Sequence, residues 1–142
     1  PVPSYELAGP KGIVRAMVKD ADLAIVNHES PIPDDWDFHL HGFFFSGKPA
    51  LTEIFTRAGV DWMSLANNHI KDYGTDGIAD TRKNLDAFGL AYSGAGKNLK
   101  QAREYSILEV KGVRIAIIPS GRSSAPAGPA FEPPCPSRVA WP

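Results

Sequence analysis

Cysteine is almost absent from this 142-residue chain, which contains only Cys135. A single cysteine excludes an internal disulfide and any zinc site built from several cysteines. Long apolar runs are also lacking: none approaches the roughly 20 residues that a membrane-spanning helix requires, and no signal peptide is visible. Neither sign of charge predominates, because 15 Lys and Arg oppose 16 Asp and Glu, for a net charge of −1. That balance argues against a nucleic-acid-binding protein that relies on a basic surface.

The chain is long enough for one domain with a hydrophobic core, since 43% of its residues are hydrophobic. It begins with Pro1 rather than Met, so we expect it to be part of a longer protein. Seven of its 13 prolines fall between Pro119 and Pro142, and proline cannot continue a central strand. We therefore expect a partial domain over residues 1–118 and an extended or disordered tail over residues 119–142.

Helical and strand patterns alternate along the chain until the proline-rich region begins. The predicted helices are residues 11–19, 49–59 and 75–89. The predicted strands are residues 23–26, 60–65, 90–92, 105–110 and 113–118, the last two forming a hairpin. This alternation indicates a layered α/β fold with largely parallel strands and a C-terminal hairpin.

Burial and capping positions follow from the same patterns. The continuous apolar run Leu23–Val26 predicts a strand that is buried on both faces. The predicted buried face of the second helix consists of Leu51, Ile54, Phe55 and Ala58. Thr75 is the expected N-cap of the third helix, because its side-chain oxygen can accept a hydrogen bond from the first turn.

Polar side chains follow two of the predicted strands at the point where each strand ends. Glu29 comes soon after the run 23–26, and Asn67, Asn68 and His69 come directly after the run 60–65. The carboxyl ends of parallel strands lie at one edge of a sheet, where open α/β folds bind ligands. We expect Glu29 and Asn68 to lie close together there, with the carboxylate placed to hold a cation. The alternative is that both segments are ordinary turns, which Asn readily forms.

The segment Ser30–Lys48 has little periodicity and is long for a loop within a compact domain, which is typical of a functional or mobile loop. His39 and His41 are two residues apart, a spacing that puts both rings on one face of an extended segment. They could belong to a metal site, but without a third ligand nearby in sequence they are more simply interpreted as surface polar groups.

Several segments, taken in their order and spacing, match one protein family. They are residues 21–31, 58–61, 64–69, 72–74, 94–98 and 111–116. Together they resemble the bacterial poly-γ-glutamate capsule-biosynthesis (CapA-type) family, which has a calcineurin-like metallophosphoesterase fold. The most specific pieces are the segment ending Asn-His-Glu-Ser-Pro and the segment Asn-Asn-His-Ile-Lys-Asp-Tyr-Gly. The resemblance covers roughly residues 11 to 118.

The resemblance implies a role for each polar residue at the strand ends. Glu29 and Asn68 would bind divalent metal ions (Mn, Mg, Zn or Fe). His69 would act as a catalytic acid or stabilise the transition state, and Asp72 would orient it. The chain departs from the family pattern in lacking the usual first strand with its Gly-Asp motif and the later His-containing loops, and His28 stands where an aliphatic residue is usual. At most half of a two-metal site is therefore present, and we expect the chain alone to be inactive.

Three functions remain open from the sequence. The first is part of a metal-dependent phosphoester hydrolase of capsule biosynthesis, acting on an acidic polymer or a phosphoester. The second is a non-catalytic scaffold or polymer-binding subunit of a capsule synthase, and the third is a phosphoesterase unrelated to capsules. The resemblance implies an extracytoplasmic, cell-envelope protein whose full-length form is membrane-anchored, although a cytoplasmic location stays open. An unpaired sheet edge would favour homo-oligomers.

Overall fold

The computed structural model of the chain describes residues 13–36 and 44–121. His39, His41 and most of the predicted tail lie outside the described residues. Within them, α2 (Ile13–Lys19) precedes the strand β1 (Ile25–Asn27), and the short helices η1 (Pro49–Leu51) and α3 (Glu53–Ala58) precede β2 (Trp62–Ser64). The chain continues through η2 (His69–Lys71), α4 (Gly74–Ala87), β3 (Ala91–Ser93), α5 (Leu99–Ala102), β4 (Ser106–Val110) and β5 (Val113–Ile117).

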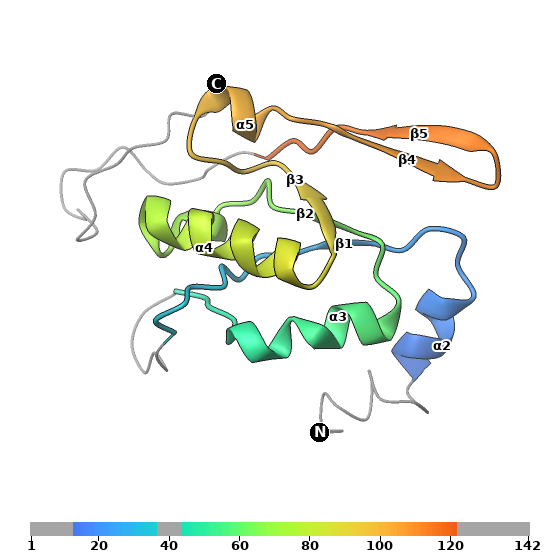
Figure 1. The fold of residues 1–142 in the computed structure, drawn as a ribbon, viewed down its shortest axis with the longest axis horizontal. Helices are drawn as coiled ribbons and strands as arrows, with labels where there is room; N and C mark the ends of the chain where they lie inside the picture. Colours follow the sequence, from blue (N-terminus) through green and yellow to red (C-terminus); the bar gives the residue numbers. More distant parts are fainter. Residues whose placement is uncertain (1–12, 37–43, 122–142) are drawn as a thin grey trace.

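Strands β1, β2 and β3 form a parallel sheet in that order, with Ile25, Trp62 and Ala91 in register. Each strand is reached from the one before it through a helix, α3 or α4. Right-handed crossovers that always step in the same direction put both helices on one face of the sheet. Figure 1 shows α3 and α4 on one side of the sheet and the β4–β5 hairpin on the other. The predicted α/β fold with a parallel sheet and a C-terminal hairpin is therefore confirmed.

The hydrophobic core lies between the sheet and the two helices. On this face the central strand contributes Met63, which is fully buried, and α4 contributes Ile78 and Leu85. Val26 and Tyr92, which are in register with Met63, pack against the same cluster. Ile78 and Leu85 are seven residues apart, a spacing that puts both side chains on the same face of α4.

The opposite face of the sheet is covered by the segment that leads into the hairpin. Trp62 is 2% exposed, and its indole Nε1 donates a hydrogen bond of 2.8 Å to Ser106 Oγ. At the far end of the hairpin, Lys111 forms an ion pair of 2.6 Å with Asp22. The hairpin is therefore linked to the sheet at Ser106, and its turn contacts the segment that precedes β1.

Three burial and capping predictions are wrong. Ile25 is 50% exposed, because β1 pairs only with β2 in the part of the chain that the structure describes and so forms an edge of the sheet. On the predicted buried face of the second helix, Ala58 is buried and Phe55 packs against the core, but Leu51 and Ile54 are 53% and 38% exposed and Thr52 is buried in their place. Helix α4 begins at Gly74, one residue before the expected cap Thr75, and Tyr73 is its N-cap residue.

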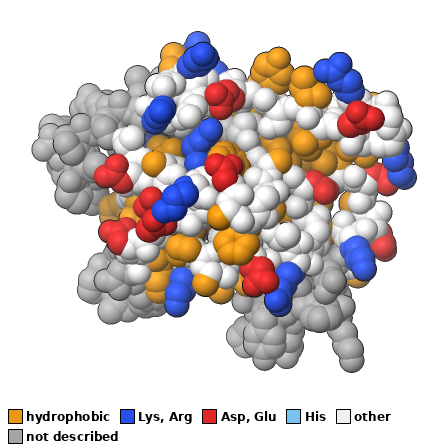
Figure 2. Space-filling model, viewed as in Figure 1, with side chains coloured by type: hydrophobic (Ala, Val, Ile, Leu, Met, Phe, Trp, Pro, Cys, Tyr) orange, Lys and Arg blue, Asp and Glu red, His pale blue; other side chains and the backbone are white. Residues whose placement is uncertain are grey.

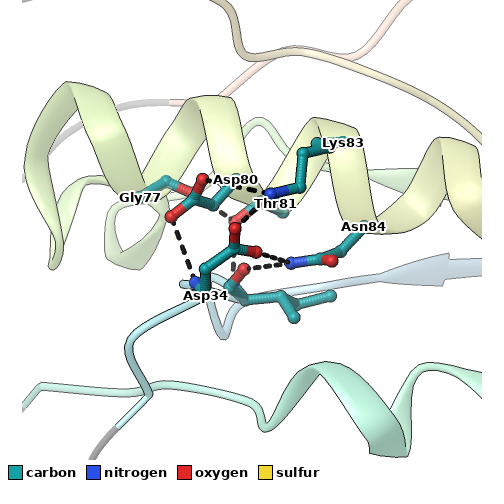
Figure 3. Close-up of polar contacts among 7 residues, drawn as sticks. Asp34, Gly77, Asp80, Thr81, Lys83 and Asn84 are labelled. Carbon is teal, nitrogen blue, oxygen red and sulfur yellow. Dashed lines mark hydrogen bonds and ion pairs between the residues drawn. The ribbon is translucent and has the colours of Figure 1, made fainter.

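A polar cluster fixes the loop after β1 to one side of α4 (Figure 3). Asn84 Nδ2 donates to the Ile32 carbonyl at 2.9 Å and to Asp34 Oδ1 at 3.1 Å. Thr81 Oγ1 accepts a hydrogen bond of 2.7 Å from Ile32 N, and Asp80 accepts one of 3.1 Å from Asp34 N. An ion pair between Lys83 and Asp34 completes the cluster. The loop that begins at the end of β1 is therefore held in one position.

Removing Asn84, one of the buried members of this cluster, should destabilise the fold. We expect Asn84→Ala to lower the free energy of unfolding by about 1–3 kcal/mol, because the Ile32 carbonyl loses its partner in a buried position. Urea unfolding followed by tryptophan fluorescence measures the change. Lys83→Ala is the matched control on the same helix: its side chain is 62% exposed, and we expect no measurable loss. Equal losses of unfolding free energy in the two variants would contradict the view that the buried hydrogen bond of Asn84, and not the exposed ion pair of Lys83, stabilises the loop.

Candidate functional site

The carboxyl ends of β1 and β2 lie side by side, as the sequence predicts. His28 N donates a hydrogen bond of 2.9 Å to the Ser64 carbonyl, one residue beyond the end of β1. Leu65 N donates one of 2.9 Å to the Ser93 carbonyl at the end of β3. The segment that carries Glu29 and the loop that carries Asn67, Asn68 and His69 thus begin at the same edge of the sheet. We call this edge the candidate site.

Asn67 joins the two loops of the candidate site. Its Nδ2 donates to the His28 carbonyl at 2.9 Å and to Asn27 Oδ1 at 3.3 Å. Its Oδ1 accepts hydrogen bonds from His69 N at 3.1 Å and Ile70 N at 2.9 Å. The side chain therefore caps the short helix η2 and ties it to β1. The sequence predicted a turn-forming role for the asparagines of this loop only as the alternative to a ligand site, and it did not single out Asn67.

Asn68 and Glu29 are both exposed at the candidate site. Asn68 occupies the N-cap position of η2, but its side chain makes no capping hydrogen bond. Glu29 Oε1 accepts one long hydrogen bond of 3.3 Å from Asn27 Nδ2. Their oxygen atoms are thus the ones least committed to the fold, while their roles as metal ligands stay predictions.

The described residues do not fit a complete metal site. Among residues 13–36 and 44–121, no group of three or more His, Cys, Asp and Glu side chains is placed to hold a metal ion. A divalent cation bound by protein oxygens normally needs more ligands than one carboxylate and one amide. Two metals would need more still. Any such centre therefore requires ligands from outside these residues.

His69 is held on two sides. Its Nδ1 lies 3.0 Å from Asp72 Oδ2, and the Phe45 ring packs against it with 4.2 Å between ring centroids. An ionised carboxylate only accepts hydrogen bonds, so this contact puts a proton on Nδ1 and leaves Nε2 to exchange protons. The His69 side chain is 19% exposed, so its ring reaches the surface only in part. Its catalytic role, and that of Asp72, stay predictions.

Phe45 is a second residue of the candidate site that sequence reasoning missed. Its backbone N donates a hydrogen bond of 2.7 Å to Asp72 Oδ2, the same oxygen that contacts His69. Next to it, Ser46 Oγ accepts a hydrogen bond of 3.2 Å from the Tyr73 hydroxyl. The end of the long loop is thus attached to the residues that follow η2. No local sequence pattern marks this contact, because 27 residues separate its two partners.

Gly94 and Gly121 allow two more segments to approach the candidate site. Gly94 has a φ of +106°, and a Cβ there would lie 2.7 Å from Ala66 N. A Cβ at Gly121 would lie 2.1 Å from the Ala66 carbonyl oxygen. Only glycine fits such contacts without a shift of the backbone. The chain after β5 therefore returns to the Asn-Asn-His loop at the end of the described residues.

His28 lies beneath the candidate site and is only 7% exposed. Burial lowers the pKa of its imidazole to about 4, although a hydrogen bond with the Ser30 backbone acts in the opposite direction. The ring contacts Phe55 edge-on, with 5.3 Å between centroids. The imidazole is therefore neutral at pH 7 and belongs to the interior, where the family resemblance expects an aliphatic side chain.

Comparison with known proteins identifies relatives along most of the chain. The family model of the bacterial capsule synthesis protein PGA_cap matches residues 3–135. The chain is 32% identical over 114 residues to the capsule biosynthesis protein CapA of Bacillus anthracis, covering 74% of this chain and 26% of that protein. It is 32% identical over 104 residues to a probable polyglutamine synthesis accessory protein of Mycobacterium tuberculosis, covering 70% and 26%. It is also 28% identical over 123 residues to an uncharacterized protein of Sinorhizobium fredii, covering 82% and 27%. The chain spans about a quarter of the length of these relatives.

Proposed function

Because the chain belongs to the bacterial capsule synthesis protein family PGA_cap, a family of metallophosphoesterase-like domains, we propose that it is part of a capsule biosynthesis protein and carries one half of a metallophosphatase-like site. The polymer that we propose is poly-γ-glutamate, and the location is the cell envelope, outside the cytoplasm. No helix of the described residues is long and apolar enough to cross a membrane.

One observation carries the proposed hydrolase chemistry: the contact of 3.0 Å between His69 Nδ1 and Asp72 Oδ2 at the carboxyl edge of the sheet. A histidine oriented by a carboxylate is a common arrangement for moving a proton to or from a reacting group. In our proposal His69 Nε2 exchanges that proton with the substrate, while Asp72 keeps the proton on Nδ1. Phe45 limits rotation of the ring by packing against it.

We propose that Glu29 and Asn68 contribute to binding a divalent metal ion, of which Mn, Mg, Zn and Fe are the candidates. Both side chains are exposed at the same edge of the sheet, and their oxygen atoms are suitable ligands for a hard cation. The remaining ligands would come from other parts of the full-length protein. We assign no reaction step to a metal, because the described residues do not complete a site for one.

The full-length protein and this chain should therefore differ in activity. We expect the full-length protein, with manganese added, to hydrolyse an aryl phosphate, and His69→Ala to lower its kcat/KM by about 10²–10⁴-fold. Asp72→Asn should also lower kcat/KM, whereas Asp76→Asn, an exposed residue in the first turn of α4, should leave it unchanged. This chain alone should show only the background rate, with or without His69. Robust turnover by the chain alone that disappears in His69→Ala would contradict the expected incompleteness.

The non-catalytic alternative predicts a different result in the same assay. A scaffold or polymer-binding subunit would give background rates even at full length, together with binding of an acidic polymer. On the face seen in Figure 2, Lys and Arg side chains alternate with Asp and Glu and form no continuous basic area. That face thus gives a polyanion no electrostatic preference. A phosphoesterase unrelated to capsules would hydrolyse the aryl phosphate without binding the polymer.

We also propose that the chain self-associates through β1, whose outer edge is unpaired within the described residues. Unpaired backbone groups and the exposed Ile25 side chain favour pairing with another strand. Light scattering across a range of concentrations tests this. A constant monomer mass up to millimolar concentration would exclude it.

A further inference from the structure

A cavity of about 620 Å³ lies between the end of β1 and the segment η1–α3. This volume falls within the range of pockets that bind small molecules. The end of β1 contributes His28 and Glu29 to its lining, and Lys48 contributes a second charged side chain. The cavity therefore adjoins the candidate site but is built mainly from residues to which the proposed hydrolase chemistry assigns no role.

Most of the cavity wall is apolar. Ile32 and Phe55 line it together with Leu51 and Ile54. Ile32 is 1% exposed, whereas Leu51 and Ile54 are 53% and 38% exposed and so leave aliphatic surface at the cavity in contact with water. An apolar molecule in the cavity would remove part of this aliphatic surface from water, which favours binding.

Two buried polar atoms belong to residues that line the cavity and lack partners. Within the described residues, His28 Nε2 and Thr52 Oγ1 are buried and make no hydrogen bond. An imidazole nitrogen accepts or donates a hydrogen bond according to the tautomer of the ring, and the Thr52 hydroxyl can also do either.

Leaving two such atoms unpaired costs free energy that a ligand can recover. A buried polar group without a hydrogen bond typically costs about 1–3 kcal/mol. A ligand hydroxyl that a small movement of the surrounding side chains admits to this wall could exchange hydrogen bonds with His28 Nε2 and Thr52 Oγ1. A charged group would suit the site less well, because the wall beside these atoms is formed by Ile32 and Phe55.

We propose that this cavity binds a small apolar alcohol or phenol, with the hydroxyl between His28 and Thr52 and the apolar body against Leu51, Ile54 and Phe55. The occupant is a free small molecule or the corresponding group of a larger substrate. The proposal is independent of metal binding and of hydrolysis, since none of these five residues is a proposed metal ligand or proton carrier.

The test compares two probes of similar size, p-cresol and toluene, by titration of amide chemical shifts in the full 142-residue chain. We expect p-cresol to bind about 3- to 10-fold more tightly than toluene, the gain of roughly one net hydrogen bond. The largest shifts should fall on residues 51–55. Equal affinities would show that the cavity binds apolar groups without regard to the hydroxyl, and would overturn the proposal. Shifts confined to other residues, or the absence of binding by either probe, would also overturn it.

Variants separate the hydroxyl contact from simple apolar binding. Thr52→Val keeps the shape of the side chain, so toluene affinity should be unchanged while p-cresol affinity falls to that of toluene. His28→Phe keeps an aromatic ring against Phe55 and should have the same effect. Thr56→Val is the matched control one turn later on α3, at an exposed position outside the cavity, and should change neither affinity. Thermal unfolding of each variant confirms that the fold is intact. If both Thr52→Val and His28→Phe still bound p-cresol more tightly than toluene by the wild-type ratio, the proposal would be overturned.

Discussion

Replacing Asn67 with alanine is expected to lower the free energy of unfolding by about 2–4 kcal/mol, the largest effect of any single substitution at the candidate site. The side chain makes four hydrogen bonds, to Asn27 Oδ1, the His28 carbonyl, His69 N and Ile70 N. Ile70 is fully buried, so its amide would lose its partner where water does not easily replace it. Urea unfolding at pH 7 measures the loss.

Asn68→Ala is the matched control, because it removes the same side chain from the next residue. Asn68 is exposed, and its side chain makes no capping hydrogen bond. We expect its effect on stability to stay within about 0.5 kcal/mol. Comparing the two variants therefore distinguishes Asn67, which stabilises the fold, from Asn68, whose side chain is available to a ligand. Equal losses in the two variants, or a larger loss in Asn68→Ala, would contradict this division.

The two neighbouring asparagines show how far the sequence predicts the candidate site. An apolar run followed by polar residues predicts a strand end, and two such ends in an α/β pattern predict a common edge of the sheet. The parallel pairing of β1 with β2 confirms this. Which amide turns inward depends on contacts with Asn27 and His28, about 40 residues away in the chain. No local pattern distinguishes Asn67 from Asn68.

The helical segment before β2 shows why the burial of individual side chains was harder to predict than the secondary structure. Pro49 does begin a helical segment, as expected. However, the first turn is a 3-10 helix, and the α-helix begins only at Glu53. A 3-10 helix has about 3.0 residues per turn instead of 3.6, so side chains in it point in directions that an α-helical pattern does not predict. Leu51 is consequently exposed and Thr52 buried.

The buried His28 should make the stability of the chain depend on pH between about 4 and 6.5. Its pKa is lowered from 6.5 to about 4 in the folded protein by burial. As the pH falls below 6.5, the unfolded chain gains a proton at this histidine while the folded chain does not. The contribution of the neutral His28 to the free energy of unfolding is thus fully present above pH 6.5. It decreases as the pH falls, by about 1.4 kcal/mol per pH unit and about 3 kcal/mol in all.

His28→Leu should remove this dependence, because leucine does not titrate and places an aliphatic side chain beside Phe55. Glu29 and Lys48 line the same cavity as His28, and both are present in the wild type and the variant, so the difference between the two profiles isolates the imidazole. Urea unfolding at pH 7, 6.5, 6, 5.5 and 5 covers the part of the window above the ordinary pKa values of carboxylates. We expect the wild type to lose about 2 kcal/mol more than His28→Leu between pH 6.5 and pH 5. Parallel profiles would mean that His28 takes up its proton equally well in the folded chain, and that its burial does not hold it neutral.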